Sequence, residues 1–567
     1  MIVGIDLGTT NSLCAVWQEG AARLVPNAHG TVLTPSAVSV DANGEILVGL
    51  AARERVQSHP ERSAAAFKRY MGTERKLVLA SREFRPEELS ALVLRALKAD
   101  AEAFLGEPVD EAIITVPAYF NDTQRKATRI AGELAGLKVP RLLNEPTAAA
   151  LAYGLQEAMR ESKFLVFDLG GGTFDVSVLE LFEGVIEVRA TAGDNFLGGE
   201  DFVDAIVDWF PRAAKLELPS AETDPAPHAQ LRRQAEAAMR RLSEVDATEI
   251  EVTWKERGHA AKLSRDAFQS LAEPLLQRLR RPIERAVHDA RIKPGELTHV
   301  VLAGGATRMP MVRRLAGLLL GRPPMQQINP DEVVAQGAAV QVGLYGRDQA
   351  VKEVVLTDVA PYTLGIETMR YLGNGRFADG QYLPIIERNT VVPTSRSETV
   401  YSVADNQTGF KIKVFQGESR LVADNIKLGE VAIAVPPGPA GKEGAEVRFT
   451  YDVSGLLEVE VKALSTGERK KTVIQENPGG MSEAEVETKL AALADLKIAP
   501  RERAEYRALV ARAERLHEEA LGEARQAIAG AIVAFEGVLQ NGKLEAIEEH
   551  RLKLTQMLDR IDREFRL

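Results

Sequence analysis

The sequence has very little cysteine, few aromatic residues and no long apolar run. Its one cysteine, Cys14, cannot close a disulfide within the chain, so we expect a reducing compartment, the cytoplasm. The longest uncharged stretches, such as Val333 to Gly346, are shorter than the roughly 18 apolar residues that a membrane-spanning helix needs. The first residues also lack a basic stretch followed by an apolar core. We therefore expect neither a secretory signal nor a transmembrane segment.

The chain also has fewer basic than acidic residues. The chain has 70 Lys and Arg residues against 81 Asp and Glu residues, a net charge of -11. Because a negative protein repels phosphate backbones and anionic lipids, we expect no nucleic acid and no membrane surface among its partners. With 567 residues, 45% of them hydrophobic and 27% charged, the composition is that of a folded chain of about three or four domains.

Up to about residue 347 the sequence alternates short β-branched runs with amphipathic helical patterns, which predicts an α/β architecture. The predicted strands are Ile2–Ile5, Ile113–Val116, Phe164–Phe167, Val176–Leu179 and Val300–Leu302. Helices are predicted over Pro86–Phe104 and Gln124–Leu137. We assign residues 1–347 to one domain with two similar lobes.

The pattern changes after residue 347. We predict a linker over residues 348–358, a β-sandwich over 359–478 and a helical lid or bundle over 479–567. Strand-like alternation with turn signals recurs in the sandwich region, at Thr399–Val403, Phe410–Phe415, Val447–Tyr451 and Leu457–Val461. Beyond Ser482, glycine and proline become sparse and apolar residues recur at helical spacing, at Tyr506, Leu509, Val510, Ala513, Leu516 and Ala520.

Two segments far apart in the first domain share one pattern: a strand, Asp-Leu, a glycine turn and threonine. They are Asp6-Leu7-Gly8-Thr9-Thr10 and Asp168-Leu169-Gly170-Gly171-Gly172-Thr173. Successive backbone N–H groups in such a turn can bind phosphate oxygens, and the aspartate before the turn can hold Mg²⁺. Either turn alone is more often only a tight hairpin. The two turns together, with threonines at matching positions, predict a phosphate site between two lobes.

No G-x-x-x-x-G-K-[ST] loop and no G-x-G-x-x-G followed by a helix is present, so the P-loop and dinucleotide-binding classes lose their main support. Further motifs accompany the two turns: Asn144-Glu145-Pro146-Thr147-Ala148-Ala149-Ala150, residues 192–202 (AGDNFLGGEDF) and Ile328-Asn329-Pro330-Asp331-Glu332. With them the chain resembles the seventy-kilodalton heat-shock chaperones of the DnaK type over nearly its whole length. Short lobe insertions, the segment Ser12 to Trp17 and the compact ending resemble the HscC branch.

The resemblance implies an actin-like ATPase fold that binds ATP or ADP with Mg²⁺ between its lobes, with K⁺ as a further ion. It implies catalytic roles for Lys68, at the γ-phosphate, for Glu145, which positions the attacking water, and for Asp168 and Thr173. Asp6 and Asp168 would hold the metal. The remaining nucleotide contacts that it implies are Asp6, Gly8, Thr9, Thr10, Gly170, Gly171, Gly172, Gly198, Gly199, Glu236, Ser243, Gly304, Gly305, Arg308 and Asp331. From pattern alone, Lys68 could be a solvated surface amine and Glu145 a helix terminus.

The same resemblance implies coupling and client-binding residues. A relay between nucleotide and interdomain surface would use Pro117, Arg125, Arg141, Leu356 and Asp358, with Arg141 also contacting a J-domain cochaperone. An extended apolar segment of an unfolded client would lie in a sandwich cleft lined by Ile366, Met369, Tyr401, Ala404, Phe410, Ile412 and Leu456. Without the resemblance, these apolar residues would be ordinary sandwich core.

The sequence departs from the family pattern at three positions and in one region. Met239 stands in place of a lysine near the ribose, Phe410 in place of a valine at the client pocket, and Thr357 in place of a linker leucine. We therefore expect faster nucleotide exchange and a narrow client set. In the alternative, the phenyl ring turns under Tyr401 as part of the sandwich core and leaves the client pocket open. The region 208–246, where exchange factors bind in relatives, is short, which makes dependence on such a factor uncertain.

The function predicted is an ATP-dependent chaperone, an ATPase whose hydrolysis step closes the cleft on a bound polypeptide; we expect a monomer. A sugar or acetate kinase of the same fold is the alternative. It would need a catalytic base beside a polar small-molecule pocket and would leave about the last 200 residues unexplained. An actin-like filament protein would end near residue 347.

Overall fold

The computed structural model describes most of the chain. The described residues are 1–156, 162–182, 185–219, 223–224, 226–255, 257–325, 328–351, 355–373, 376–452, 455, 457–473, 481, 483–494, 496, 503–520, 522–541 and 544–564. No helix among them is long and apolar enough to cross a membrane.

The first lobe is built on a mixed sheet in which β1 lies between β10, which runs parallel to it, and β2, which runs antiparallel. The strand order is β11-β10-β1-β2-β3, and β4 pairs with β2. The bounds are β1 Ile2–Asp6, β2 Asn11–Gln18, β3 Ala21–Leu24, β4 Thr34–Pro35, β10 Glu111–Val116 and β11 Lys138–Asn144. Helices α2 (Pro86–Leu105) and α3 (Asp122–Leu134) cover its outer face and share a core with it.

The second lobe repeats this plan with the strand order β17-β12-β13-β14-β18-β21. The bounds are β12 Ser162–Leu169, β13 Phe174–Phe182, β14 Val185–Asp194, β17 His299–Ala303, β18 Val355–Val359 and β21 Val391–Val392. Its outer face is covered by α5 (Gly199–Ala213), α6 (Ala226–Arg241), α7 (Arg265–Asp289) and α8 (Pro310–Leu320).

Helices α4 (Glu145–Gln156) and α9 (Val333–Tyr345) lie between the two sheets. They cross closely because Gly337 has no side chain: a Cβ there would lie 1.7 Å from the carbonyl oxygen of Ala148. The inner faces of both lobes are therefore held together by one central helix pair. In each lobe, the glycine turn predicted to bind phosphate lies beside this helix pair.

Smaller elements extend the lobes outward. The first lobe carries a three-stranded sheet with α1 (Leu50–Ser58), and a hairpin; the second carries another hairpin. The strands are β5 Ala37–Val40, β6 Ile46–Val48 and β7 Ser63–Ala65, then β8 Leu77–Leu79 with β9 Arg82–Phe84, and β15 Ala247–Trp254 with β16 Arg257–Ser264. Short 3₁₀ helices are η1 Pro60–Arg62, η2 Phe67–Tyr70, η3 Pro294–Glu296, η4 Gly305–Arg308, η5 Gln349–Val351 and η6 Val422–Asp424.

Two four-stranded antiparallel sheets follow and pack through one apolar core, as a β-sandwich. The first sheet contains β20 Arg376–Ile386, β19 Leu364–Gly373, β23 Gly409–Gln416 and β24 Ile426–Ala434. The second contains β22 Thr394–Tyr401, β25 Gly444–Tyr451, β26 Leu457–Ala463 and β27 Arg469–Val473. Strand β26 alternates strictly between buried and half-buried residues, as expected of a strand with one face on a core.

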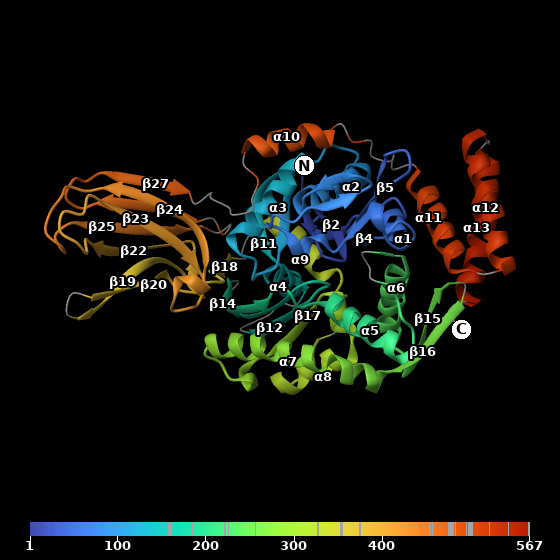
Figure 1. Ribbon diagram of the computed structural model, residues 1–567, viewed down its shortest axis with the longest axis horizontal. Helices are drawn as coiled ribbons and strands as arrows, with labels where there is room; N and C mark the ends of the chain where they lie inside the picture. The colour runs from blue at the N-terminus through green and yellow to red at the C-terminus, as the bar shows by residue number, and fades with distance from the viewer. Residues whose placement is uncertain are drawn as a thin grey trace.

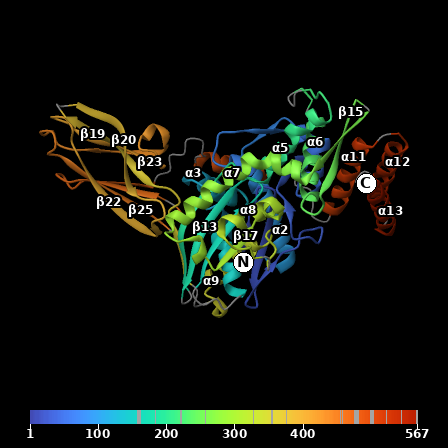
Figure 2. The same cartoon turned by 90° about the horizontal axis from the view of Figure 1, so that it is seen from below.

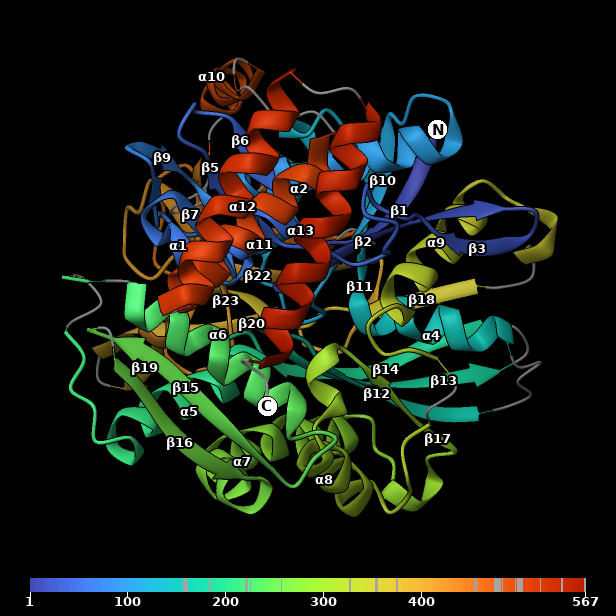
Figure 3. The same cartoon turned by 90° about the vertical axis from the view of Figure 1, so that its right-hand side faces the viewer.

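Among the described residues after 481, the helices are α10 Glu483–Ala494, α11 Ala504–Glu519, α12 Gly522–Asn541 and α13 Leu544–Glu564. Figure 1 shows the β-sandwich at the left of the two lobes and α11–α13 at the right. Figure 2 agrees, so the sandwich and these helices lie at opposite ends of the molecule. Figure 3 shows α12 and α13 in front of α11, which packs on α1 of the first lobe.

The mixed α/β content predicted from the sequence is confirmed, with two differences in detail. The helix predicted over Gln124–Leu137 begins at Asp122, because Asn121 caps it by accepting from the backbone N–H of Gln124 at 2.9 Å. It ends at Leu134, just before Gly136 adopts φ 72°. In the expected linker, residues 355–358 form part of β18, which pairs with β14 and β21.

Candidate functional site

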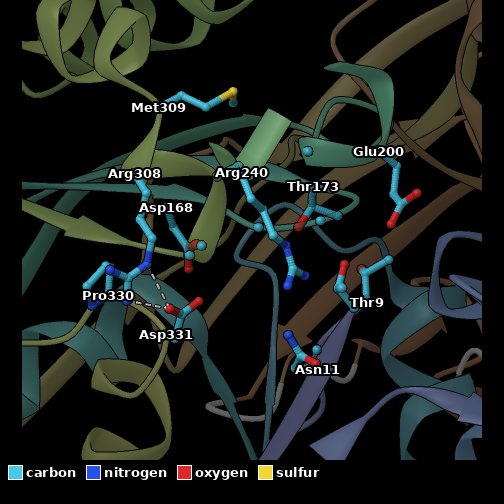
Figure 4. A pocket seen from close by; sticks show the side chains of 18 of the residues that line it. Thr9, Asn11, Asp168, Thr173, Glu200, Arg240, Arg308, Met309, Pro330 and Asp331 are labelled. Carbon is cyan, nitrogen blue, oxygen red and sulfur yellow. Dashed lines mark hydrogen bonds and ion pairs between the residues drawn. The ribbon is translucent and has the colours of Figure 1, made fainter. Parts of the chain in front are cut away.

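A cavity of about 590 Å³ lies between the two lobes, where the glycine turns of both sheets meet. Figure 4 shows Thr9 and Asn11 at the right of this cavity and Arg308 and Asp331, joined by dashed lines, at the left. The turns touch each other directly. A Cβ on Gly171 would lie 2.0 Å from Thr10 Oγ1, so the second turn approaches the first only because this residue is glycine.

Nearly all the expected nucleotide contacts line this one cavity. From the first lobe come Asp6, Gly8, Thr9, Thr10, Lys68 and Glu145, and from the second Asp168, Gly170, Gly171, Thr173, Gly199, Glu236, Ser243, Gly304, Gly305, Arg308 and Asp331. Gly172 and Gly198 are not among the lining residues. They pack against each other beside it: a Cβ on Gly198 would lie 2.4 Å from the backbone nitrogen of Gly172.

One end of the cavity gathers acidic side chains around a single lysine. Lys68 Nζ lies 2.8 Å from Glu145 Oε1, and both side chains are buried. Burial, with Glu145 nearby, raises the pKa of Asp6 to about 7 and raises that of Asp168 well above its usual range. Such crowding of carboxylates in a buried site is unfavourable without a compensating positive charge.

This end fits a divalent cation. Asp168 Oδ2 is buried and has no hydrogen-bond partner among the described residues. Carboxylate oxygens are the ligands that Mg²⁺ prefers, and a cation would offset the charge that the raised pKa values of Asp6 and Asp168 reflect. The donor set of Asp6 and Asp168 thus suits a magnesium ion beside the two phosphate-binding turns.

The opposite end of the cavity is formed by α6 and by the start of α8. Glu236 forms an ion pair with Arg53 of α1 and another with Arg240 Nη2 at 2.7 Å. Met239 lines the cavity here with its thioether, and Ser243 follows one turn later. Arg308 Nη2 lies 2.6 Å from Asp331 Oδ2, which fixes the guanidinium plane at the edge of the cavity.

The sequence reasoning missed several residues that complete the lining: Asn11, Leu13, Leu33, Glu200, Val203, Arg240, Glu244, Ala306, Met309, Arg313, Pro330 and Val334. Arg240 and Glu244 could have been found, because they neighbour the expected Glu236 and Ser243 in sequence, and so could Glu200 and Pro330, which stand inside two of the quoted motifs. The others depend on which face of an element turns inward, and no motif marks them.

The expected coupling residues form one buried network with the described part of the linker. Arg125 Nη2 donates to Asn144 Oδ1 at 2.8 Å and to the carbonyl of Ala118, which follows Pro117. Asn144 Nδ2 donates in turn to Asp358 Oδ2 at 2.7 Å. Leu356 pairs with Ile186 in the sheet register, so β18 connects this network to the second lobe. Arg141 lies nearby on β11 with its Nε buried and without a partner among the described residues.

The expected client residues fall into two groups. Ile366, Phe410 and Ile412 are buried in the sandwich core, at 0%, 7% and 4% exposure. Met369 and Tyr401 are exposed at 49% and 56%, and Ala404 is exposed in the loop after β22. Leu456 lies outside the described residues. The phenyl ring of Phe410 thus belongs to the same apolar cluster as Ile366 and Ile412, the other two buried residues of the expected cleft.

Comparison with known proteins supplies the family. A family model described as Hsp70 protein matches residues 2–78 and 75–564. The chain is also 43% identical over 486 residues to proteins named chaperone protein DnaK from Thermotoga petrophila, Thermotoga maritima and Thermotoga neapolitana. Each alignment covers 83% of this chain and 80% of the relative.

Proposed function

The chain belongs to the Hsp70 family, and from this premise we propose that it is an ATP-dependent chaperone. It hydrolyses ATP to ADP and phosphate and couples that step to binding extended apolar segments of unfolded proteins. The observation that carries this proposal is the cavity in which both glycine turns, Lys68, Glu145 and Asp168 converge. The relatives named as chaperones match 83% of this chain.

We assign the chemistry of hydrolysis to the buried end of the cavity. Phosphoryl transfer depends mostly on positioning the nucleophile and neutralising charge on the transferred group. Glu145 positions the attacking water, and Lys68 and Thr173 bind the γ-phosphate. A magnesium ion held by Asp6 and Asp168 would supply positive charge beside the phosphates. We also include K⁺ as a further ion, as the resemblance implies.

We propose an actin-like ATPase domain over residues 1–347, a linker over 348–358, a polypeptide-binding β-sandwich over 359–478 and a helical lid over 479–567. The ATPase domain and the β-sandwich are supported by their own sheets and cores. Residues 355–358 of the linker pair with the second lobe through β18. The boundary at 478–479 lies outside the described residues. Because α11–α13 lie away from the sandwich, this arrangement leaves the client cleft uncovered, and we propose that hydrolysis brings the lid over it.

A narrow client set is part of the proposal. Three of the expected cleft residues, Ile366, Phe410 and Ile412, are packed in the sandwich core, and Phe410 is larger than the usual valine. An entering leucine side chain would have to displace this packing, at a cost of about 1–3 kcal/mol. Generic unfolded peptides should then bind weakly. Within the family, we propose membership of the HscC branch from the short insertions and compact ending.

For partners, we propose unfolded polypeptides and a J-domain cochaperone that contacts Arg141. Use of an exchange factor is to be determined by measuring nucleotide release with and without such a factor. We propose a monomer in the cytoplasm. The buried thiol of Cys14, whose pKa is raised by burial, is protected from disulfide chemistry and is consistent with that compartment.

The deciding experiment measures the products of ATP turnover in the full-length protein. Free phosphate, with a rate that rises when an unfolded client and a J-domain protein are added, supports the chaperone. A phosphorylated sugar or acetate would identify the kinase alternative instead. A pull-down would then identify clients as the polypeptides that the wild-type protein retains after hydrolysis and that Glu145→Ala protein, held in its ATP-bound form with an open cleft, does not retain.

A further inference from the structure

A second cavity, of about 690 Å³, lies where both lobes meet the β-sandwich. Arg69 and Tyr119 line it from the first lobe, three arginines of α7 line it from the second, and Tyr362 lines it from the sandwich. We call it the arginine cavity, after Arg69, Arg278, Arg281 and Arg285. The functions proposed above make no use of it.

The lining of the arginine cavity is positively charged. It contains four arginines and one acidic residue, Asp194. The three arginines of α7, Arg278, Arg281 and Arg285, follow each other at helical spacing and so share one face of the helix. In a chain with a net charge of -11, such a concentration of positive charge favours an anionic ligand.

Three of these four arginines have a polar partner, and one has none among the described residues. Arg69 is bound by Asp201 at 2.9 Å, and Arg278 by Asp194 at 2.7 Å. Arg285 donates to Tyr119 Oη at 3.2 Å and forms an ion pair with Asp289 at 3.9 Å. Within the described part of the chain, no hydrogen bond or ion pair engages Arg281, which lines the cavity and is exposed. Its guanidinium is therefore available to an incoming anion.

The arginine cavity and the nucleotide cavity adjoin each other at Gly172. A Cβ on Gly172 would lie 2.8 Å from Thr9 Oγ1 and 2.8 Å from Arg69 Cγ, so both side chains pack against this one glycine. Thr9 lines the nucleotide cavity and Arg69 lines the arginine cavity. The phosphate-binding turns of the first cavity therefore lie next to the arginine lining of the second.

We propose that the arginine cavity is a binding site for inorganic phosphate, the anion that ATP hydrolysis releases in the adjoining nucleotide cavity. The proposal rests on the ATPase activity proposed above. Arg281 binds the phosphate through paired N–H···O hydrogen bonds, the geometry in which guanidinium recognises phosphate oxygens. The product is thereby held near the site of cleavage before it reaches solvent.

The β-sandwich forms part of this site. The Tyr362 hydroxyl donates to the carbonyl oxygen of Tyr119 at 2.8 Å, and the two rings lie 4.3 Å apart between centroids. The wall that Tyr362 contributes is present only while the sandwich is docked on the lobes. Retention of phosphate is therefore expected to end when the sandwich leaves.

The first test titrates inorganic phosphate into full-length Glu145→Ala protein loaded with ATP, so that the γ-phosphate position is already filled. We expect saturable binding, weakened about tenfold or more by adding Arg281→Glu, which replaces a ligand by a repelling charge. Arg280→Glu is the matched control. Arg280 neighbours Arg281 but lies outside the cavity lining and pairs with Glu284 at 2.7 Å. Absence of phosphate binding, or equal weakening by both substitutions, overturns the proposal.

The second test compares ATP cleavage, measured by acid quench in a single turnover, with phosphate release, measured by a fluorescent phosphate sensor. In otherwise wild-type protein, release should lag behind cleavage, and Arg281→Glu should remove the lag without changing cleavage. The same lag in Arg281→Glu and Arg280→Glu contradicts the proposal. If the protein neither binds nor cleaves ATP, the proposed ATPase function is wrong instead. ATP cleavage is measured before phosphate release, so the two failures can be told apart.

Discussion

Lys68 and Glu145 form a buried ion pair, 2.8 Å between Nζ and Oε1, although they are 77 residues apart in the sequence. Lys68 lies on η2 and Glu145 opens α4, so the pair joins an outer element to the central helix pair. A bound γ-phosphate would compete with Glu145 for the lysine. The carboxylate would then be free to accept a hydrogen bond from the attacking water.

Hydrolysis should therefore depend strongly on this end of the cavity. We expect Glu145→Ala, Lys68→Ala and Thr173→Ala each to lower single-turnover ATP cleavage by about 10²-fold or more, the scale for a positioned transition-state contact. ATP binding should persist and cleavage should require Mg²⁺. Lys76→Ala is the control, because Lys76 is an exposed lysine paired with Glu83. Cleavage at the wild-type rate in all three variants would refute the site assignment.

Nucleotide release should respond to Met239. Its thioether lines the cavity beside Glu236 and Ser243 but cannot donate a hydrogen bond to the ribose. We expect Met239→Lys to restore one such bond, worth about 0.5–1.5 kcal/mol, and so to slow ADP release roughly two- to tenfold. Stopped-flow release of labelled ADP measures the rate. Met239→Leu, which adds no donor, should leave it unchanged, and an equal rate in Met239→Lys would count against this role.

Motifs in the sequence were enough to assemble most of the nucleotide cavity, because the turn glycines and Lys68, Glu145 and Asp168 carry recognisable local patterns. Residues such as Val203 and Leu33 were missed, since only the packing of their elements turns them inward. The pairing of β18 with β14 could not be predicted from the sequence either. Strand pairing is set by contacts distant in sequence, and the segment around Leu356 was predicted only as a linker.

Coupling should depend on Asp358. Its carboxylate accepts from Asn144 Nδ2 at 2.7 Å and from Thr147 Oγ1 at 3.3 Å. We expect Asp358→Ala to abolish most of the stimulation of ATPase activity by client, while basal cleavage remains, because hydrogen bonds to a buried carboxylate contribute about 1.5–3 kcal/mol each. Asp348→Ala, just before the linker strand, is the control. Full stimulation in Asp358→Ala would show that this network does not transmit the signal.

Client binding should respond to the size of residue 410. The ring of Phe410 is 7% exposed and its cross-strand partner on β24 is Ile433. We expect Phe410→Val to bind leucine-rich peptides more tightly, because it removes bulk from the cleft wall. Ile433→Val controls for lost core packing, and thermal unfolding of both variants reports its cost. Equal or weaker peptide binding in Phe410→Val would mean that the ring serves only the core.

Docking of the helical lid on the first lobe should depend on two crossed ion pairs. Arg515 of α11, with a side chain only 1% exposed, pairs with Glu54 of α1, and Arg55 pairs with Glu514 at 3.1 Å. Leaving one partner of a buried pair alone typically costs about 3–5 kcal/mol. We therefore expect Glu54→Arg to release the lid from the lobe.

Fluorescence energy transfer between labels on α1 and α12, measured with ATP bound, would report this release as a fall in efficiency. The double variant Glu54→Arg with Arg515→Glu reverses both charges and should recover docking at least in part, because the pair is re-formed with opposite polarity. Glu61→Arg is the control, since Glu61 is an exposed neighbour in η1 whose one ion pair is with Arg62. Unchanged transfer in Glu54→Arg would mean that apolar packing, such as that of Ala508 against Ala51 and Ala52, holds the lid without these charges.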